Sequence, residues 1–184
     1  SAVPTPAVDP AQRDEARRLI LQLAPANGHG HWSAAKQLLA LKKAHPGAYS
    51  AALGELLASE TPVPGQAQPR LATLALHVES SLPVLEEARS QIEGLASYSR
   101  QFSDEFGGDQ EGLQNYVTRL IMGMTAHLSE SINLLLEDLR EPVGVHGLGH
   151  ALDVVDNVLE MALIERKRHP EVPISIQAIV AAAM

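Results

Sequence analysis

The sequence predicts an all-α fold, a helical bundle built around a long antiparallel αα-hairpin with shorter N-terminal helices. Hydrophobic residues make up 45% of the 184 residues, a composition typical of globular proteins. Aromatic residues make up only 3%, so the core must consist of Leu, Ala, Ile and Val, which favours packed helices over a β-sandwich. Apolar residues recur every three or four positions along most of the chain, and no alternating pattern of comparable strength predicts a strand.

Three short helices are predicted over residues 10–60. Residues 1–9 are Pro-rich and typical of a linker, so we expect the domain to be part of a larger polypeptide. Asp9 followed by proline is typical of an N-cap and a first helical position, and Ser33 is predicted to cap the second helix. The apolar faces of the three helices are Ala16, Leu19, Ile20 and Leu23, then Leu38, Leu39 and Leu41, then Tyr49, Leu53, Leu56 and Leu57.

A Pro-rich connector over residues 61–69 is predicted to separate these helices from a helical bundle over residues 70–184. Beyond the connector the apolar positions repeat every seven residues, the pattern of a helix packed along its length against a neighbour. Pro83 interrupts this stretch, so we expect a kink or break there, with Ser80 or Ser81 capping a fresh start. One heptad position holds Val78, Leu85, Ile92 and Phe106, with Ser99 as the polar exception, and the other holds Leu74, Ala88, Leu95 and Phe102, with Ser81 as the exception.

The Gly-Gly turn in "FGGD" is predicted to join this stretch to a second long helix over residues 109–140, completing the hairpin. A further helix is expected from about Gly149 to Arg168, with a basic last turn that suits the negative end of the helix dipole. A short helix is expected in "ISIQAIVAAAM". The apolar stripes of these helices are Leu113, Val117, Leu120, Met124, Leu128, Ile132, Leu135 and Leu139; Leu152, Val155, Leu159 and Ala162; and Ile176, Ile179 and Val180.

Charge and composition exclude several classes of protein. The formal net charge of −8 argues against nucleic-acid binding, which needs a basic surface. No apolar run approaches the roughly 20 residues of a transmembrane helix, so no transmembrane segment is expected. The opening "SAVPTPAVDP" lacks the charged and apolar regions of a signal peptide. Cysteine is absent, which excludes disulfides, thiolate metal sites and cysteine nucleophiles. We expect a soluble protein. The sequence does not predict its compartment, although its Ala/Leu-rich composition would suit a secreted or translocated bacterial protein.

The stretch "PVGVHGLGHALDVVDNVLEMAL" holds two histidines four residues apart where a helix is expected to begin. His146 and His150 would lie one helical turn apart, with Asp153 on the same face, so zinc or nickel would find three ligands there. The histidine spacing is that of zinc proteases, but Gly147 stands where their catalytic glutamate would be. The alternative is a turn between packed helices, in which Gly144, Gly147 and Gly149 serve backbone conformation or packing clearance and so allow the helix over residues 109–140 to approach the next helix closely.

The longer stretch "VHGLGHALDVVDNVLEMALIERKRHPE" resembles the phospho-acceptor helix of a histidine-kinase subfamily with a box of the type "HDGLGHAL". The resemblance implies a phosphorylated histidine at His146. The sequence departs from that pattern at Gly147, where the family has an acidic residue, and it carries no glycine-rich nucleotide-binding box. These departures put the kinase activity in doubt, and the activity is not carried over to this chain.

A second histidine cluster lies in "HGHW". His29 and His31 would chelate a metal or flank a partner surface at Trp32; alternatively, Trp32 packs as a hydrophobic staple before Ser33 while the histidines stay solvated. No nucleophile elbow, phosphate-binding loop or dinucleotide fingerprint occurs, so catalytic residues remain unassigned and enzymatic activity is left open. No cofactor is expected other than zinc or nickel.

Three classes of function therefore stay open. The first is a protein–protein interaction domain of the adaptor or effector type, as the acidic composition and the absence of a recognisable catalytic motif favour. The second is a metal-binding or sensory helical domain using His146, His150 and Asp153. The third is an enzyme, or a domain that recruits one, with an unfamiliar all-α fold. The sequence does not predict the oligomeric state or the identity of a partner.

Overall fold

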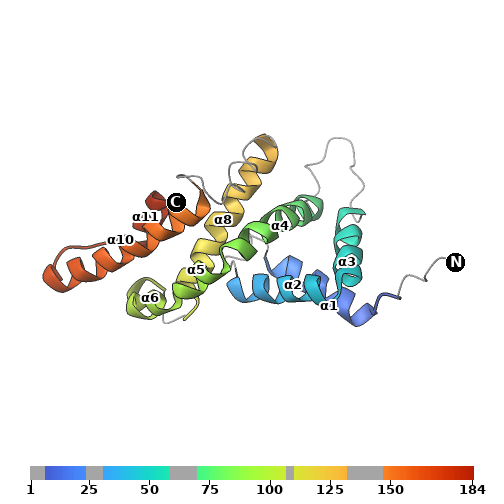
Figure 1. Ribbon diagram of the computed structural model, residues 1–184, viewed down its shortest axis with the longest axis horizontal. Helices are drawn as coiled ribbons and strands as arrows, with labels where there is room; N and C mark the ends of the chain where they lie inside the picture. Colours follow the sequence, from blue (N-terminus) through green and yellow to red (C-terminus); the bar gives the residue numbers. More distant parts are fainter. Residues whose placement is uncertain (1–6, 24–30, 59–69, 107–109, 132–146) are drawn as a thin grey trace. The chain divides into compact units, whose positions relative to one another are not determined.

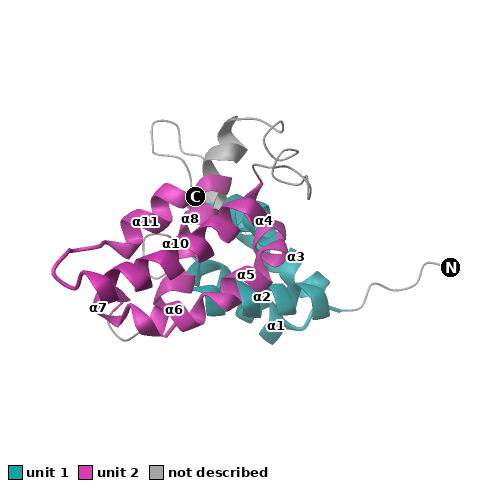
Figure 2. Ribbon diagram, turned by 60° about the vertical axis from the view of Figure 1, so that its left-hand side comes forward, with its two compact units in different colours: residues 1–82 teal, residues 83–184 magenta. Residues whose placement is uncertain are grey.

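In the residues that the structure, a computed structural model, describes, the chain is built from α-helices without any strand (Figure 1). The described residues are 7–23, 31–58, 70–106, 110–131 and 147–184. The predicted all-α class is confirmed. The chain forms two compact units, residues 1–82 and residues 83–184 (Figure 2). The helices are α1 (Pro10–Gln22), α2 (Trp32–Ala44), α3 (Pro46–Ala58), α4 (Arg70–Glu87), α5 (Arg89–Gly94), α6 (Ala96–Gln101), α7 (Ser103–Phe106), α8 (Gly112–Ser131), α10 (Leu148–Arg168) and α11 (Ile176–Ala183).

In the first unit, α1, α2 and α3 pack against one another. Asp9 caps α1 as predicted, because its Oδ1 accepts a hydrogen bond from the Ala11 amide at 2.9 Å and Pro10 is the first helical residue. Several of the buried residues of α2 and α3 are alanines, which allow helix axes to approach closely. The buried side chains are Ala16, Leu19, Ile20 and Leu23; Trp32, Ala34, Ala35 and Leu38; and Ala48, Tyr49, Ala52 and Leu56.

The start of α2 differs from the prediction. The helix begins at Trp32 with His31 at the N-cap position, so Ser33 lies inside the first turn, where its Oγ accepts a hydrogen bond from Gln37 at 3.1 Å. Burial of a large apolar side chain stabilises a fold by about 1.5–3 kcal/mol. A serine cap contributes about 1 kcal/mol, so burial of Trp32 outweighs it. Trp32 is therefore a core residue rather than part of a partner surface, while His29 lies outside the described residues.

A cluster of Lys42, Tyr49 and Glu79 joins α2, α3 and α4 within the first unit. The Tyr49 hydroxyl donates a hydrogen bond to Glu79. Lys42 Nζ lies 3.5 Å from Glu79 Oε1 and 4.9 Å from the centre of the Tyr49 ring. Burial, and then the bond to Glu79, raise the pKa of Tyr49 well above its ordinary value, so the hydroxyl remains a hydrogen-bond donor. The cluster thus satisfies the polar end of a buried aromatic residue.

From the start of α4, in the first unit, to Phe106, in the second, the chain keeps one face buried without forming a single helix. Three buried residues spaced seven apart, Ala88, Leu95 and Phe102, separate the consecutive helices α4 to α7. The Leu95 amide bonds to the carbonyl of Ile92, three residues back, so the helical hydrogen bonding is tighter at this residue. The predicted heptad residues Leu74, Val78, Ser81, Leu85, Ala88, Ile92, Leu95, Ser99 and Phe102 are all buried, and Phe106 is half-buried.

Of the kink or break predicted at Pro83, the break is wrong, because α4 continues through this residue to Glu87. Pro83 is exposed, so its ring lies away from the core. Ser81 does not cap a new helix; its Oγ donates to the carbonyl of His77 at 2.6 Å, a bond made from inside a helix.

The long antiparallel hairpin that the sequence predicts is not confirmed. Its first arm is divided into α4 to α7, and of its second arm the structure describes α8, since residues 132–146 lie outside the described residues. Leu113 and Val117 are buried on α8 as predicted, but the stripe continues through Ile121 rather than Leu120, which is half-buried. The reason is that α8 packs against α5, α6 and α11, so more than one side of it is covered.

Polar side chains satisfy the backbone where these helices end. Ser99, the polar exception in the heptad pattern, accepts a hydrogen bond from the Leu113 amide in the first turn of α8 at 3.2 Å. The buried Gln114 donates from Nε2 to the carbonyl of Ile92 at 3.2 Å, near the end of α5. Buried backbone groups at helix ends are costly without such partners, so these two side chains have structural roles.

The last two described helices pack against each other and connect to the rest of the second unit. α10 contacts α5 and α11, and α11 also contacts α8. Figure 1 shows α11 folded back along α10 after the connection over residues 169–175. The predicted inward stripe of α10 is confirmed, as is the placement of Ile176 and Val180 in the core, whereas Ile179 is half-buried. The buried stripe of α10 is Leu148, Leu152, Val155, Leu159 and Ala162.

Two glycines of α8 should respond oppositely to substitution by alanine. A Cβ added at Gly112 would lie 2.6 Å from Cβ of Phe106, whereas one added at Gly123 would meet no atom within 4 Å. We expect Gly112→Ala to lower the free energy of unfolding by about 1–3 kcal/mol through overpacking. Gly123→Ala should raise it by roughly 0.5–1 kcal/mol, because alanine favours the helix. Urea unfolding followed by far-UV circular dichroism measures both, and equal effects would contradict the close approach at Gly112.

Candidate functional site

The predicted metal ligands are only partly described. His146 lies outside the described residues, while His150 and Asp153 are exposed on the first turns of α10. Asp153 Oδ1 accepts a hydrogen bond at 3.0 Å from Gln91 Nε2, which also donates to the carbonyl of Gly149 at 3.0 Å. No group of three possible metal ligands occurs among the described residues. The structure therefore pairs Asp153 with an amide of α5, and the zinc or nickel site stays a prediction.

Gly149 does not provide packing clearance at the start of α10, and Gly144 lies outside the described residues. A Cβ at Gly149 would meet nothing within 4 Å, so the close approach predicted there is wrong. Gly147 is the N-cap residue and has φ −74°, a conformation open to any residue. The expected helix start is correct, since α10 begins at Leu148.

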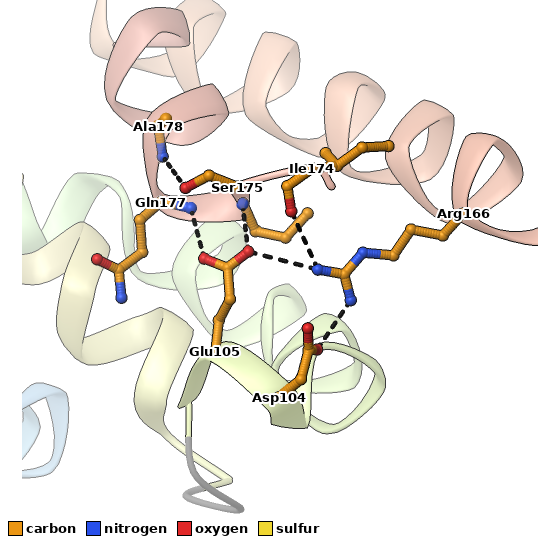
Figure 3. A network of polar contacts seen from close by, with 8 residues as sticks. Asp104, Glu105, Arg166, Ile174, Ser175, Gln177 and Ala178 are labelled. Atoms are coloured by element: carbon orange, nitrogen blue, oxygen red, sulfur yellow. Dashed lines mark hydrogen bonds and ion pairs between the residues drawn. The ribbon is translucent and has the colours of Figure 1, made fainter. Parts of the chain in front are cut away.

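A cluster of Asp104, Glu105 and Arg166 joins α7 to the end of α10 (Figure 3). The Arg166 guanidinium lies 2.8 Å from Asp104 Oδ1 and 3.4 Å from Glu105 Oε1, and it donates to the carbonyl of Ile174 at 3.2 Å. It also lies 4.9 Å from the centre of the buried Phe102 ring, a cation–π distance. We refer to Asp104, Glu105 and Arg166 as the Arg166 cluster.

Glu105 also caps α11 from a distant part of the chain. Its carboxylate accepts hydrogen bonds from the backbone amides of Ile176 and Gln177, the first two residues of the helix, the second at 3.1 Å. Ser175, the N-cap residue, accepts a further bond from the Ala178 amide at 3.3 Å (Figure 3). Three amides at the N-terminus of α11 thus have partners, and the negative charge of Glu105 lies at the positive end of the helix dipole.

A pocket of about 790 Å³ opens beside the Arg166 cluster, and the residues after α10 form its apolar wall. That wall consists of Pro170, Val172, Pro173 and Ile174. The bond from Arg166 holds the pKa of Asp104 below its ordinary range. This ion pair therefore persists into acidic solution, and its contribution to stability is lost as the pH falls through the lowered pKa. Asp104, Glu105 and Arg166 bind one another, so the charged side chains that line the pocket have a structural role: they connect α7 to α10.

The side of α10 that points away from the core carries exposed apolar residues. Met161 is 63% exposed and Ile164 is 43% exposed, three residues apart. At about 100° per residue, they share one side of the helix with Val154 and Asn157, roughly 160° away from the buried stripe. Val154 is half-buried and Asn157 is exposed. We call Val154, Asn157, Met161 and Ile164 the outer face of α10.

The outer face and the Arg166 cluster were both missed by sequence reasoning. The periodicity of α10 was assigned to one stripe, although Val154, Met161 and Ile164 follow a second stripe with the same spacing. That second stripe was the available signal. Arg166 was interpreted through the helix dipole, and its partners 61 and 62 residues earlier in the chain carry no local sequence signal.

No model of a known protein family matches the chain, and neither a curated protein nor a solved structure is similar to it. None of the helices in the described ranges is long and apolar enough to cross a membrane.

Removal of the Glu105 carboxylate should loosen α11. We expect Glu105→Ala to lower the free energy of unfolding by about 2 kcal/mol, because two helix-end amides and Arg166 lose a charged partner. Asp104→Asn is the matched control: Asp104 is 62% exposed, and a solvent-exposed ion pair contributes under about 1 kcal/mol. Hydrogen exchange of the α11 amides measures the local effect. Equal protection of α11 in both variants would contradict the capping role.

The metal hypothesis has a direct test. If His146, His150 and Asp153 bind zinc or nickel, millimolar metal should raise the melting temperature, because the metal would bind the native state preferentially. His146→Ala/His150→Ala should abolish that rise. No rise with the unaltered protein would retire the metal site.

Proposed function

We propose that the protein is a helical protein–protein interaction domain and that the outer face of α10 is its docking surface. The observation that carries the proposal is the exposure of Met161 and Ile164 on one side of a helix whose opposite side already lies in the core. Single exposed apolar residues are common on protein surfaces. Two large ones in adjacent turns form an exposed apolar pair, and the half-buried Val154 lies on the same side of the helix beyond Asn157.

The energetics favour a protein partner for the outer face. Burial of a methionine or isoleucine side chain stabilises a complex by about 1.5–3 kcal/mol, so two such residues at the centre of an interface would act as anchors. The outer face from Val154 to Ile164 is about 15 Å long, the length of a short helix–helix contact. Neither the metal-binding nor the enzymatic alternative has a comparable observation in its favour among the described residues.

A photo-crosslinking residue in place of Met161 tests the proposal. In an extract of the source cells, we expect it to form a discrete covalent adduct with a partner protein upon illumination. The same substitution at Leu76, which is 55% exposed on α4 in the first unit, is the matched control and should give no such adduct. Ile164→Ser combined with the crosslinker at position 161 should reduce the adduct, because one anchor is lost.

Two outcomes would contradict the proposal: no adduct at position 161, or the same adducts at positions 161 and 76. Circular dichroism checks that each variant keeps its fold, as expected for substitutions at exposed positions.

A further inference from the structure

We infer that the partner of the outer face is a single amphipathic helix with lysine or arginine residues along its flanks. This inference rests on the proposed function and names the chemistry of the partner. It is carried by the spacing of the outer-face residues and by the charges that flank them.

The spacing of the outer face matches the core of a coiled coil. Val154, Asn157, Met161 and Ile164 are separated by three, four and three residues, the alternation of heptad positions a and d. A helix with this pattern accepts another helix along its length, the side chains of each filling spaces between those of the other. A peptide in extended form would not match a stripe of this period. The geometry therefore favours a helix as the occupant.

The charges beside the outer face are mostly acidic. Asp153 and Glu160 occupy one flank, and Glu165 occupies the other, at the positions that form ion pairs across a coiled coil. All three are exposed, and the amide of Gln91 holds the Asp153 carboxylate in place. A partner helix with basic residues at its flanking positions would complement these carboxylates. Such complementarity selects between partners more than it adds affinity.

A second copy of the chain fits the outer face poorly. In a parallel pair of α10 helices, Glu160 of each copy would face Glu165 of the other, and the two Arg168 side chains would meet. In an antiparallel pair centred on the face, Glu160 would face its own symmetry mate, although Asp153 and Lys167 would attract one another. Like charges therefore meet in either orientation, whereas a basic helix from another protein avoids both conflicts.

Asn157 adds a requirement on the partner's sequence. It lies between Val154 and Met161 at a core position of the heptad pattern. A polar residue at such a position fixes the register of the two helices, because its amide must find a hydrogen-bonding partner across the interface. The partner helix is expected to place a polar side chain there and leucine or isoleucine elsewhere in its core positions.

Two designed peptides test the inference with the whole chain. Both are helices of about three heptads with leucine and isoleucine core positions and one central asparagine. One carries lysine at every flanking position, and the other carries glutamate. By fluorescence anisotropy at low salt, we expect the lysine peptide to bind at least about tenfold more tightly than the glutamate peptide. Met161→Ser/Ile164→Ser should weaken its binding at least about tenfold.

Charge-reversed variants separate a docked helix from general attraction between a basic peptide and an acidic protein. Glu160→Lys/Glu165→Lys should reverse the preference, so that the glutamate peptide binds more tightly. The control Asp14→Lys/Glu87→Lys makes the same change in net charge at exposed positions on α1 and α4, and it should keep the original preference. Equal preferences in these two variants would overturn the inference, as would equal binding of the two peptides by the unaltered protein.

Sedimentation equilibrium supplies the remaining outcome. A dimer of the chain that Met161→Ser/Ile164→Ser dissociates would assign the outer face to a second copy and overturn the inference. An adduct at position 161 in the crosslinking experiment, together with no peptide preference, would leave the proposed function standing and reject only the basic helix.

Discussion

Burial of one continuous apolar face, which passes through Leu85, Ile92 and Phe102, is the constraint on which the second unit depends. A straight helix drifts away from a seven-residue repeat by about 20° per heptad, so it cannot keep such a face against its neighbours over this length. The chain meets the constraint by interrupting its helix at Ala88, Leu95 and Phe102, each of which is buried, and at Leu95 the amide bonds to the carbonyl three residues back. α8 then packs against α5 and α6, and α10 packs against α5. Gln114 bonds to a carbonyl near a tightened turn, and Ser99 bonds to the first turn of α8.

The position of α11 depends in turn on the end of the segment from Ala88 to Phe106. Glu105 follows the turn at Phe102 directly, and its carboxylate reaches the first amides of α11 while Arg166 lies over the Phe102 ring. A charged residue so placed adds to the local cap at Ser175, and it links α7, α10 and α11 through one carboxylate and one guanidinium. Because that guanidinium holds the core-facing side of α10 at its C-terminal end, the opposite side of the helix is left exposed. The outer face is thus exposed because the contacts of Arg166 fix the opposite side of α10 against the rest of the second unit.

Periodicity predicted the parts of this architecture that local sequence determines. The all-α class, the buried heptad residues and the inward stripe of α10 follow from the spacing of apolar residues, and the cap at Asp9 follows from the proline after it. The errors have a common cause, which is competition between local and tertiary effects. Burial of Trp32 outweighs a cap at Ser33, and α4 passes through Pro83 because the ring lies on the exposed side. The long hairpin is not confirmed, since a heptad pattern specifies which face of a helix is buried and not whether the helix is straight.

The same distinction between local sequence and tertiary contacts applies to the candidate site. His146 and His150 predict a metal site through their helical spacing alone, yet the described partner of Asp153 is Gln91, from a helix some 60 residues earlier. The outer face is the opposite case. Its residues lie close together on one helix, but only the tertiary structure shows that they form an exposed surface. The spacing of Val154, Met161 and Ile164 does not by itself show which side of α10 is buried. The structure shows that the opposite side of the helix lies in the core. A helix needs only one apolar side to join a bundle, and this is why we propose an occupant for the second side of α10, whose acidic flanks limit which occupants fit the proposal.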